Sequence, residues 1–236
     1  MPRNDKRKRG GGREPLQSPE TPEVSARVAR RERRRERSRE EIIEAARRVL
    51  LRDGIAAATL EAIAQEVGLT KAAIYYYYPS KDVLLFEVVF GIFQAQSDAI
   101  HAAVESAENG GQALRAIIRE TIHVFASHMD DFRLAFLHGQ VAKPGTVRVG
   151  AEQFARIRPL NDLAYGSATE LLSKDWDRAR GRADVEPRLM AFLAGMASIG
   201  ILTMKGMVES LDDPLLYSDE QLIEGLARIF EAAAQP

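Results

Sequence analysis

A run of four tyrosines, Tyr75–Tyr78, stands between the segment Lys71–Ile74 and Pro79. In a helix, four successive side chains point in all directions, so at least two of the tyrosines must face outward. A short helix that carries small residues at its N-terminal end can enter the major groove of DNA and reach base edges. Tyrosine hydroxyls on the same helix can bind phosphates. The segment therefore predicts DNA recognition.

Two short predicted helices position this segment. Thr59 can cap the first helix, and Gly68 ends it at a turn where a positive φ is needed. Thr70 can cap the second helix, which runs from Lys71 to about Tyr77 and stops before the proline. Two short helices joined by a glycine-containing turn form a helix-turn-helix. The apolar residues expected to form its core, together with the preceding helix, are Ile42, Ala46, Val49, Leu60, Ile63, Val67, Leu69 and Ile74.

Helical periodicity extends over the rest of the chain. Ser38 and Glu41 belong to a capping box, and the helix that begins there is expected to end at Gly54. Ser80 can cap a long helix that starts at Lys81. Further segments have apolar residues three and four apart, and no alternating run typical of strands exceeds four residues. We therefore expect an all-α protein of about nine helices, with a three-helix helix-turn-helix domain over residues 38–84 and a helical ligand-binding and dimerisation domain over residues 85–236.

The charge of the chain is unevenly distributed. The 236 residues have a formal net charge of −1, but residues 1–40 hold 14 Lys and Arg against 7 Asp and Glu, and the remainder hold 19 against 27. Residues 1–37 also contain few large apolar side chains, so they bury too little surface to offset the entropy lost on ordering. We expect a disordered basic arm there. It either adds phosphate or minor-groove contacts to DNA or is an unbound, solubilising tail.

Composition and motifs exclude several functions. The chain has no cysteine, which excludes disulfide frameworks and thiolate chemistry. We find no apolar run near the roughly 20 residues that a membrane helix requires and no secretory signal, so we expect a cytoplasmic protein without a membrane partner. No nucleotide-binding glycine loop, serine elbow, metal-ligand cluster or carboxylate pair indicates a catalytic site, a metal or a cofactor.

The stretch Thr59–Leu84 resembles the DNA-binding signature of TetR-family (tetracycline-repressor-like) transcriptional regulators in its helix spacing, glycine turn, aromatic run and Pro-Ser-Lys step. The resemblance covers about Ser38 to Val89, and beyond it only the general all-helical form agrees. It implies a homodimer that binds a double-stranded DNA operator with one helix-turn-helix per subunit. It further implies base contacts by Lys71, Ala72 and Ala73, phosphate or thymine-methyl contacts by Tyr75, Tyr76 and Tyr77, and DNA-backbone contacts by Thr59, Thr70 and Lys81.

The C-terminal domain is expected to hold the dimer interface and an effector pocket. Small residues on the segment 187–211, such as Ala191, Gly195 and Ser198, fit a four-helix dimer interface with the last helix, and the alternative is packing within one subunit. An apolar pocket with a few polar groups would suit a hydrophobic effector. The candidate lining residues are Thr121, Phe125, His128, Phe136, Phe154, Asn161, Tyr165 and Met190.

Together these features indicate a ligand-responsive, DNA-binding transcriptional regulator and not an enzyme. We expect a repressor that binds a palindromic operator as a homodimer and is released by a small hydrophobic effector. The alternative is a helical small-molecule carrier or enzyme whose basic tail alone binds nucleic acid. Deleting residues 1–37 separates the two, because a true reading domain keeps its sequence specificity while only the salt-dependent affinity falls.

Overall fold

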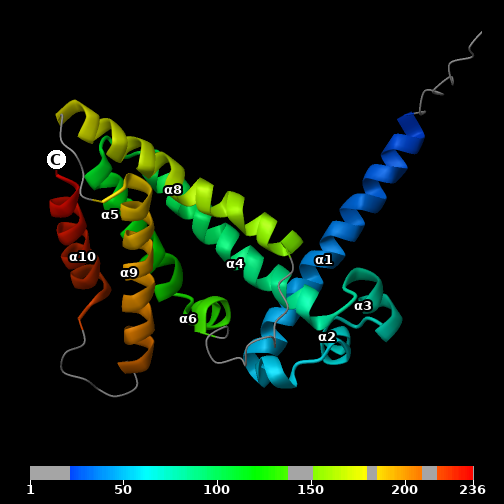
Figure 1. Cartoon of the computed structure of the whole chain (residues 1–236). Helices are drawn as coiled ribbons and strands as arrows, with labels where there is room; N and C mark the ends of the chain where they lie inside the picture. Colours follow the sequence, from blue (N-terminus) through cyan, green and yellow to red (C-terminus); the bar gives the residue numbers. More distant parts are fainter. Residues whose placement is uncertain (1–21, 138–150, 180–184, 209–216, 236) are drawn as a thin grey trace, which may run out of the picture. The chain divides into compact units, whose positions relative to one another are not determined.

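The computed structural model describes residues 22–137, 151–179, 185–208 and 217–235, and every element in these ranges is helical (Figure 1). This confirms the all-α expectation. The chain divides into two compact units, residues 1–40 and 41–236. The elements are α1 (Pro22–Ala57), α2 (Leu60–Glu66), α3 (Lys71–Tyr77), α4 (Lys81–Val104), α5 (Gly110–Ala126), α6 (Met129–Phe132), the π-helical segment η1 (Arg133–Leu137), α8 (Ala151–Ala179), α9 (Pro187–Val208) and α10 (Asp219–Ala234).

The head, which we define as residues 41–57 of α1 together with α2 and α3, forms the predicted helix-turn-helix. The Oγ1 atom of Thr59 accepts a hydrogen bond from an amide in the first turn of α2 (3.1 Å), and that of Thr70 does the same for α3 (3.2 Å). Gly68 has φ +67°, the left-handed conformation that glycine adopts without strain. Local capping and the glycine turn therefore set the angle of α3.

The core of the head contains the residues predicted from periodicity. Ile42, Ile63 and Ile74 are fully or almost fully buried, and Tyr78 joins them from the end of α3. Val67 and Leu69 pack against this cluster while remaining partly exposed. Burying side chains of this size stabilises a fold by about 1.5–3 kcal/mol each, so the small head has a defined core.

The first helix begins earlier than predicted. α1 starts at Pro22, so Ser38 lies within the helix and does not cap it, and residues 22–37 are helical rather than disordered. Arginine and glutamate both favour helices, and pairs of opposite charge three residues apart, such as Glu32 with Arg35, support one. Residues 1–21 of the expected arm lie outside the described residues. Gly54 interrupts the helix as predicted, with φ +79°.

The body, which we define as α4 to α10, is arranged around α5. This helix packs against α4, α8, α9 and α10 (Figure 1). Its apolar face, including Ile117, Ile118 and Phe125, is completely buried. The end of α10 is held in place by Trp176 of α8, whose indole nitrogen donates a 2.8 Å hydrogen bond to the carbonyl of Ala234. The start of α10 is fixed by a capping box between Ser218 and Gln221.

Two body helices correct the expectation about apolar runs. α4 and α9 are each long enough and apolar enough, by length and composition, to cross a membrane. A search for uninterrupted apolar runs misses them because single polar residues, such as Gln96 and Ser198, interrupt both helices. In the fold both helices contribute apolar residues to the hydrophobic core. Examples are Leu84 and Ile100 of α4 and Leu202 of α9, which lie in buried clusters.

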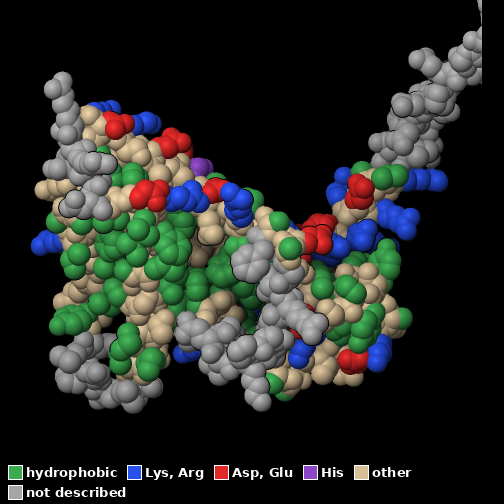
Figure 2. Space-filling model, viewed as in Figure 1, with side chains coloured by type: hydrophobic (Ala, Val, Ile, Leu, Met, Phe, Trp, Pro, Cys, Tyr) green, Lys and Arg blue, Asp and Glu red, His purple; other side chains and the backbone are tan. Residues whose placement is uncertain are grey.

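The small residues of α9 pack inside the subunit. Ala191, Gly195 and Ser198 are buried, and a Cβ atom on Gly195 would lie 2.5 Å from the hydroxyl of Tyr165 on α8. These residues therefore pack within one subunit, which is the alternative to the dimer interface expected for them. The exposed face of α9 carries large apolar side chains instead, and Figure 2 shows hydrophobic side chains gathered over this helix. They are Leu189, Phe192, Leu193 and Met196.

Candidate nucleic-acid interface and ligand cavity

The four tyrosines are divided between solvent and core. Tyr76 is 64% exposed and Tyr75 is 42% exposed, whereas Tyr78 is 3% exposed and belongs to the core. Tyr77 is half-buried, with its ring edge-to-face against Tyr76 at 5.3 Å between centroids. As expected from the helical turn, α3 therefore has a solvent-exposed outer face.

Lys71, Ala72 and Ala73 lie on the first turn of α3. The first two are exposed and Ala73 is half-buried. Because the alanines have no side chain beyond Cβ, the helix backbone can approach a surface closely at this turn. The exposed set on α3 that could touch DNA is thus Lys71, Ala72, Tyr75 and Tyr76, all of which were predicted.

An acidic residue of α2 holds Lys71 in the structure. The Lys71 ammonium lies 2.7 Å from Oε1 of Glu61, and the hydroxyl of Tyr75 donates a longer bond of 3.4 Å to the same oxygen. The Lys71 nitrogen is also 5.8 Å from the centroid of the Tyr75 ring. The hydrogen bond from Lys71 holds the pKa of Glu61 below its usual value, so the carboxylate stays charged. Sequence analysis missed Glu61, although it lies ten positions before Lys71 on the neighbouring helix.

Lys81 has a structural partner that the sequence did not predict. Its ammonium donates a 2.9 Å hydrogen bond to the backbone carbonyl of Ile55, in the turn that follows Gly54. The side chain is half-buried and connects the start of α4 with the end of α1. Contact of Lys81 with DNA stays a prediction. The side chains of Thr59 and Thr70 likewise cap their helices in the structure, and both threonines remain at least partly accessible at the ends of α2 and α3.

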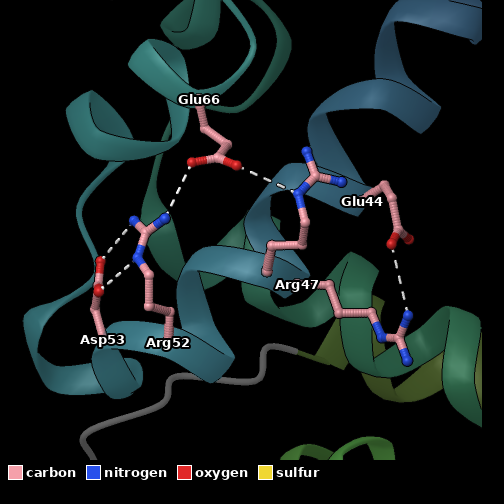
Figure 3. A network of polar contacts seen from close by, with 6 residues as sticks. Glu44, Arg47, Arg52, Asp53 and Glu66 are labelled. Carbon is pink, nitrogen blue, oxygen red and sulfur yellow. Dashed lines mark hydrogen bonds and ion pairs between the residues drawn. The ribbon is translucent and has the colours of Figure 1, made fainter.

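A charged network fastens α2 to α1 (Figure 3). Glu66 accepts a 3.3 Å hydrogen bond from Arg48 through one carboxylate oxygen and a 3.1 Å bond from Arg52 through the other. Arg52 also forms a two-point contact with Asp53, at 2.8 and 3.0 Å. The guanidinium of Arg52, and then that of Arg48, lowers the pKa of Glu66. The network lies on the outside of the head and braces α2, which supports α3.

The body contains an apolar cavity of about 190 Å³ between α4, η1, α8 and α9. Three predicted ligand residues, Phe136, Asn161 and Tyr165, line it. Burial raises the pKa of the Tyr165 hydroxyl, so this group is a neutral hydrogen-bond donor at neutral pH. Two buried polar residues of α4, Gln96 and Ser97, complete the polar part of the wall. Their position within an otherwise apolar helix is the sequence signal that could have identified them.

The other predicted ligand residues lie elsewhere. Thr121, Phe125 and Met190 are buried in the surrounding core and are not among the residues that line the cavity. His128 is exposed just before α6 and is not among the residues that line this cavity, so its contact with a ligand stays a prediction. The side chain of Phe154 lies outside the described residues. Helical spacing predicts which residues are buried, but it does not distinguish a filled core from a cavity wall.

A cluster of four aromatic rings lies at one end of the cavity. Phe136 contacts the rings of Phe93, Phe125 and Phe132 at 5.3, 5.5 and 5.2 Å between centroids. Phe132 and Phe136 lie on α6 and η1, whereas Leu134, between them in sequence, is buried in the core cluster of the head. This short segment therefore contacts both the cavity and the head.

A second hollow, of about 350 Å³, is more open and more polar. It lies near Gln112, Asp175 and Glu231, whose polar groups already have partners within the chain. Asp175 accepts from the amide of Gly110 at 2.7 Å, and Glu231 binds Arg115. The apolar cavity is therefore the better candidate for a ligand. Among the residues that the structure describes, no group of three His, Asp or Glu side chains is placed to hold a metal ion.

Comparison with known proteins identifies the head. Residues 42–88 match the family model of bacterial regulatory proteins of the tetR family. This part of the chain belongs to the TetR family. This confirms the resemblance found in the sequence, and it agrees with the expectation of a regulator rather than an enzyme. The chain is also 31% identical over 90 residues to the nicotine-responsive transcriptional repressor HdnoR of Paenarthrobacter nicotinovorans, a match that covers 38% of this chain and 44% of that protein.

Two solved structures share the fold over most of the chain. The regulator FadR from Bacillus subtilis, in complex with stearoyl-CoA, has a TM-score of 0.63 at 14% identity, over 82% of this chain and 98% of that one. AibR, in complex with isovaleryl coenzyme A and operator DNA, has a TM-score of 0.55 at 22% identity, over 81% and 96%. At these identities the likeness shows the fold alone, over the body as well as the head.

Proposed function

We propose that this TetR-family protein is a transcriptional repressor that binds a palindromic operator as a homodimer and is released by a small apolar effector. The observation that carries the proposal is the exposed face of α3, where Lys71, Ala72, Tyr75 and Tyr76 reach solvent on a helix that is capped by Thr70 and anchored by the buried Ile74. These four residues are among the nine that the family resemblance assigned to DNA.

The side chains of α3 have complementary roles in this proposal. The alanine turn brings the helix backbone close to the floor of the major groove, and Lys71 can donate to a guanine edge or a phosphate. The hydroxyls of Tyr75 and Tyr76 reach phosphates, while their rings can contact thymine methyl groups. Lys71 must leave Glu61 to do so, because the ammonium is paired there in the free protein.

The dimer is proposed to form through the exposed apolar face of α9 together with Ile229 of α10. Phe192, Leu193 and Met196 on this face are each more than a third exposed. A contiguous exposed face of large apolar residues is unusual for a monomer. A two-fold dimer would present two α3 helices, which on B-DNA must lie about 34–36 Å apart to enter successive major grooves.

The cavity supports an effector with a small apolar group and a carbonyl or similar acceptor. Its wall is mostly apolar, and Tyr165, Gln96 and Ser97 supply donors. At about 190 Å³ it is smaller than the roughly 300–1,000 Å³ of pockets that enclose drug-sized ligands. Because FadR and AibR are described with acyl-CoA ligands, we propose a short-chain acyl-CoA whose acyl group enters the cavity while the larger coenzyme moiety remains outside.

The segment from α6 to η1 is the proposed route of the response. An acyl group in the cavity displaces Phe136, and Leu134, two residues earlier, transmits the movement to the core of the head. A π-helical turn has a less regular hydrogen-bond pattern than an α-helix, and such turns occur frequently at functional sites. The effector must bind the released state more tightly than the DNA-bound state, by about 1–3 kcal/mol in typical cases.

Selection of duplexes from a random DNA pool, followed by footprinting, tests the proposal. We expect recovery of a palindrome protected by a dimer, and release of that duplex by isovaleryl-CoA or another short-chain acyl-CoA but not by free coenzyme A. Recovery of no preferred sequence would refute the reading function. A palindrome that no acyl-CoA releases would refute the effector class alone and would direct the search to other small apolar ligands.

A further inference from the structure

The N-terminal part of α1 gathers five of its arginines on one face. The backbone is regular from Pro22 up to Gly54. At about 100° per residue, five arginines fall within an arc of about 120°, and three glutamates fall on nearly the opposite side. The arginines are Arg27, Arg30, Arg31, Arg34 and Arg37, and the glutamates are Glu32, Glu36 and Glu40; all eight are exposed. Three further arginines, Arg33, Arg35 and Arg39, lie outside this arc, on or beside the side that holds the glutamates. We call the five arginines the arginine stripe.

We propose that the arginine stripe is a second DNA-binding surface, which lies along the phosphate backbone of one strand beside the site read by α3. This inference rests on the proposed function for its biological setting, but the surface would bind duplex DNA of any sequence. It is distinct from the expected disordered arm, because the helix arranges the arginines in a fixed line.

The dimensions of the stripe fit a phosphate backbone. Arg27 and Arg37 are ten residues apart, which corresponds to about 15 Å along an α-helix. One DNA strand has a phosphate about every 3.4 Å along the duplex axis, so this length spans about four phosphates. Arginine binds phosphate through two parallel hydrogen bonds and keeps its charge at any accessible pH. The opposite face, with Glu32 and Glu36, would point away from the polyanion.

The position of the stripe in the chain keeps it near any DNA that the head binds. Arg37 precedes Ile42, where the match to the family begins, by only five residues. Five residues span at most about 18 Å even when fully extended. The stripe is therefore held at a high effective concentration near that DNA, however the two units are oriented.

A membrane surface is a less suitable partner. Helices that lie on membranes combine basic residues with a broad apolar face that enters the lipid. Between Arg27 and Glu40 the only apolar side chains are Val28 and Ala29. This helix therefore has charge for a polyanion but too little apolar surface for a bilayer, and duplex DNA is the occupant that we propose.

Two variants of the full-length chain test the proposal. In the neutralised variant, the five arginines of the stripe are replaced by glutamine, which has a similar helix propensity. The charge-swapped variant carries Arg30→Glu, Glu32→Arg, Arg34→Glu and Glu36→Arg, so its composition and net charge are those of the original protein. Circular dichroism checks that both variants retain their helix content.

The readout is the dependence of the binding constant on salt, measured with a duplex of mixed sequence and with the selected duplex. Removing one phosphate contact makes the slope of log K against log salt less negative by about 0.9. Because the stripe spans about four phosphates, we expect the slope of the neutralised variant to be less negative by about 3.5 per subunit. The charge-swapped variant should show a much shallower slope as well. A slope equal to that of the unmodified chain in the neutralised variant would overturn the proposal.

The charge-swapped variant distinguishes an ordered stripe from a charged tail. If it binds both duplexes like the unmodified chain, only total charge matters and the stripe is refuted. Weakened binding to phosphatidylserine vesicles with unchanged DNA binding would assign the face to a membrane and also refute it. Failure of the proposed function gives a different result: no sequence preference in any protein, with the stripe-dependent slope still present on the mixed duplex.

Discussion

Arg47 of α1 and Asp131 of α6 form a two-point salt bridge between the head and the body. Nε of Arg47 lies 2.5 Å from Oδ1 of Asp131, and Nη2 lies 2.7 Å from Oδ2, although 84 residues separate the two in sequence. Their side chains are 30% and 18% exposed. The hydrogen bond with Asp131 is the main cause that raises the pKa of Arg47. Asp131 directly precedes Phe132 of the aromatic cluster, so the bridge joins the segment beside the cavity to the head.

We expect Arg47 and Asp131 to be energetically coupled in folding and in the response to effector. In a double-mutant cycle with Arg47→Gln and Asp131→Asn, urea unfolding should give a coupling energy of about 1–2 kcal/mol, between the values for exposed pairs and for buried charged hydrogen bonds. Asp130→Asn is the control, because Asp130 pairs with Arg133 of the adjoining η1 segment. Additive effects of Arg47→Gln and Asp131→Asn would contradict the coupling.

The effector response provides a second readout of the same bridge. Each single variant should bind the operator within a few-fold of the unmodified protein but should be released less completely by the effector, because one of the links between cavity and head is removed. The measurement is operator affinity with and without a saturating acyl-CoA. An unchanged ratio of the two affinities would show that the bridge only stabilises the fold.

Two tyrosines in the same run should respond to truncation in opposite ways. Tyr76→Ala removes an exposed side chain, so we expect an unchanged melting temperature and a decrease in DNA affinity of about 5- to 150-fold, typical of a specific contact. Tyr78→Ala removes a core side chain and should lower the free energy of unfolding by about 3–5 kcal/mol. Fluorescence anisotropy with the selected duplex and urea denaturation measure the two effects. A Tyr76→Ala variant with full affinity would place the reading surface elsewhere.

Removing the partner of Lys71 should strengthen DNA binding. Glu61→Gln releases the ammonium from its 2.7 Å ion pair and removes a negative charge near the phosphates. Because exposed ion pairs are weak, we expect a gain in operator affinity of up to about fivefold. Lys71→Ala should lower operator affinity. Adding Glu61→Gln to the Lys71→Ala variant should then raise operator affinity by less than Glu61→Gln does in the unmodified protein. Weaker binding by Glu61→Gln alone would indicate that the carboxylate positions Lys71 for DNA.

A single methyl group on α9 should disturb the cavity. The Cβ atom introduced by Gly195→Ala would lie 2.5 Å from the Tyr165 hydroxyl, so the ring that lines the cavity must move. We expect effector affinity to fall at least tenfold while operator affinity is retained. Gly200→Ala on the same helix is the matched control, because its Cβ meets nothing within 4 Å and alanine favours helices. If calorimetry gave the Gly195→Ala variant the same effector affinity as the unmodified protein, Tyr165 would not be part of the site.

The network around Glu66 predicts a specific dependence of stability on acid. The guanidiniums of Arg52 and Arg48 lower the folded-state pKa of Glu66 below its ordinary value of 4.5. Its contribution is therefore complete above the unfolded-state pKa and disappears as the pH falls through the lower folded-state pKa. In urea unfolding from about pH 6 to about pH 3, Glu66→Gln should lose less stability on acidification than the unmodified protein. Glu41→Gln, at an exposed position of α1, should behave like the unmodified protein.

Much of the head could be predicted because its determinants are local. The caps at Thr59, Thr70 and Ser80 are formed with amides only three residues away, and Gly68 has the positive φ that its position in the turn required. Helical spacing likewise predicted that Ile74 is buried and Tyr76 is exposed. Local propensity also explains why the predicted start of the first helix at Ser38 was wrong. The charge pairs before Ser38 favour helix, and α1 extends back to Pro22.

The sequence by itself determined which residues share a helix and which of them share a face, because hydrogen bonds and side-chain spacing within a helix are local. Only the tertiary structure decided what each face meets. It placed Gly195 against Tyr165 within the subunit, excluded His128 from the cavity and joined Arg47 to Asp131. These contacts depend on how helices far apart in the chain pack together, and periodicity contains no information about the partner of a face.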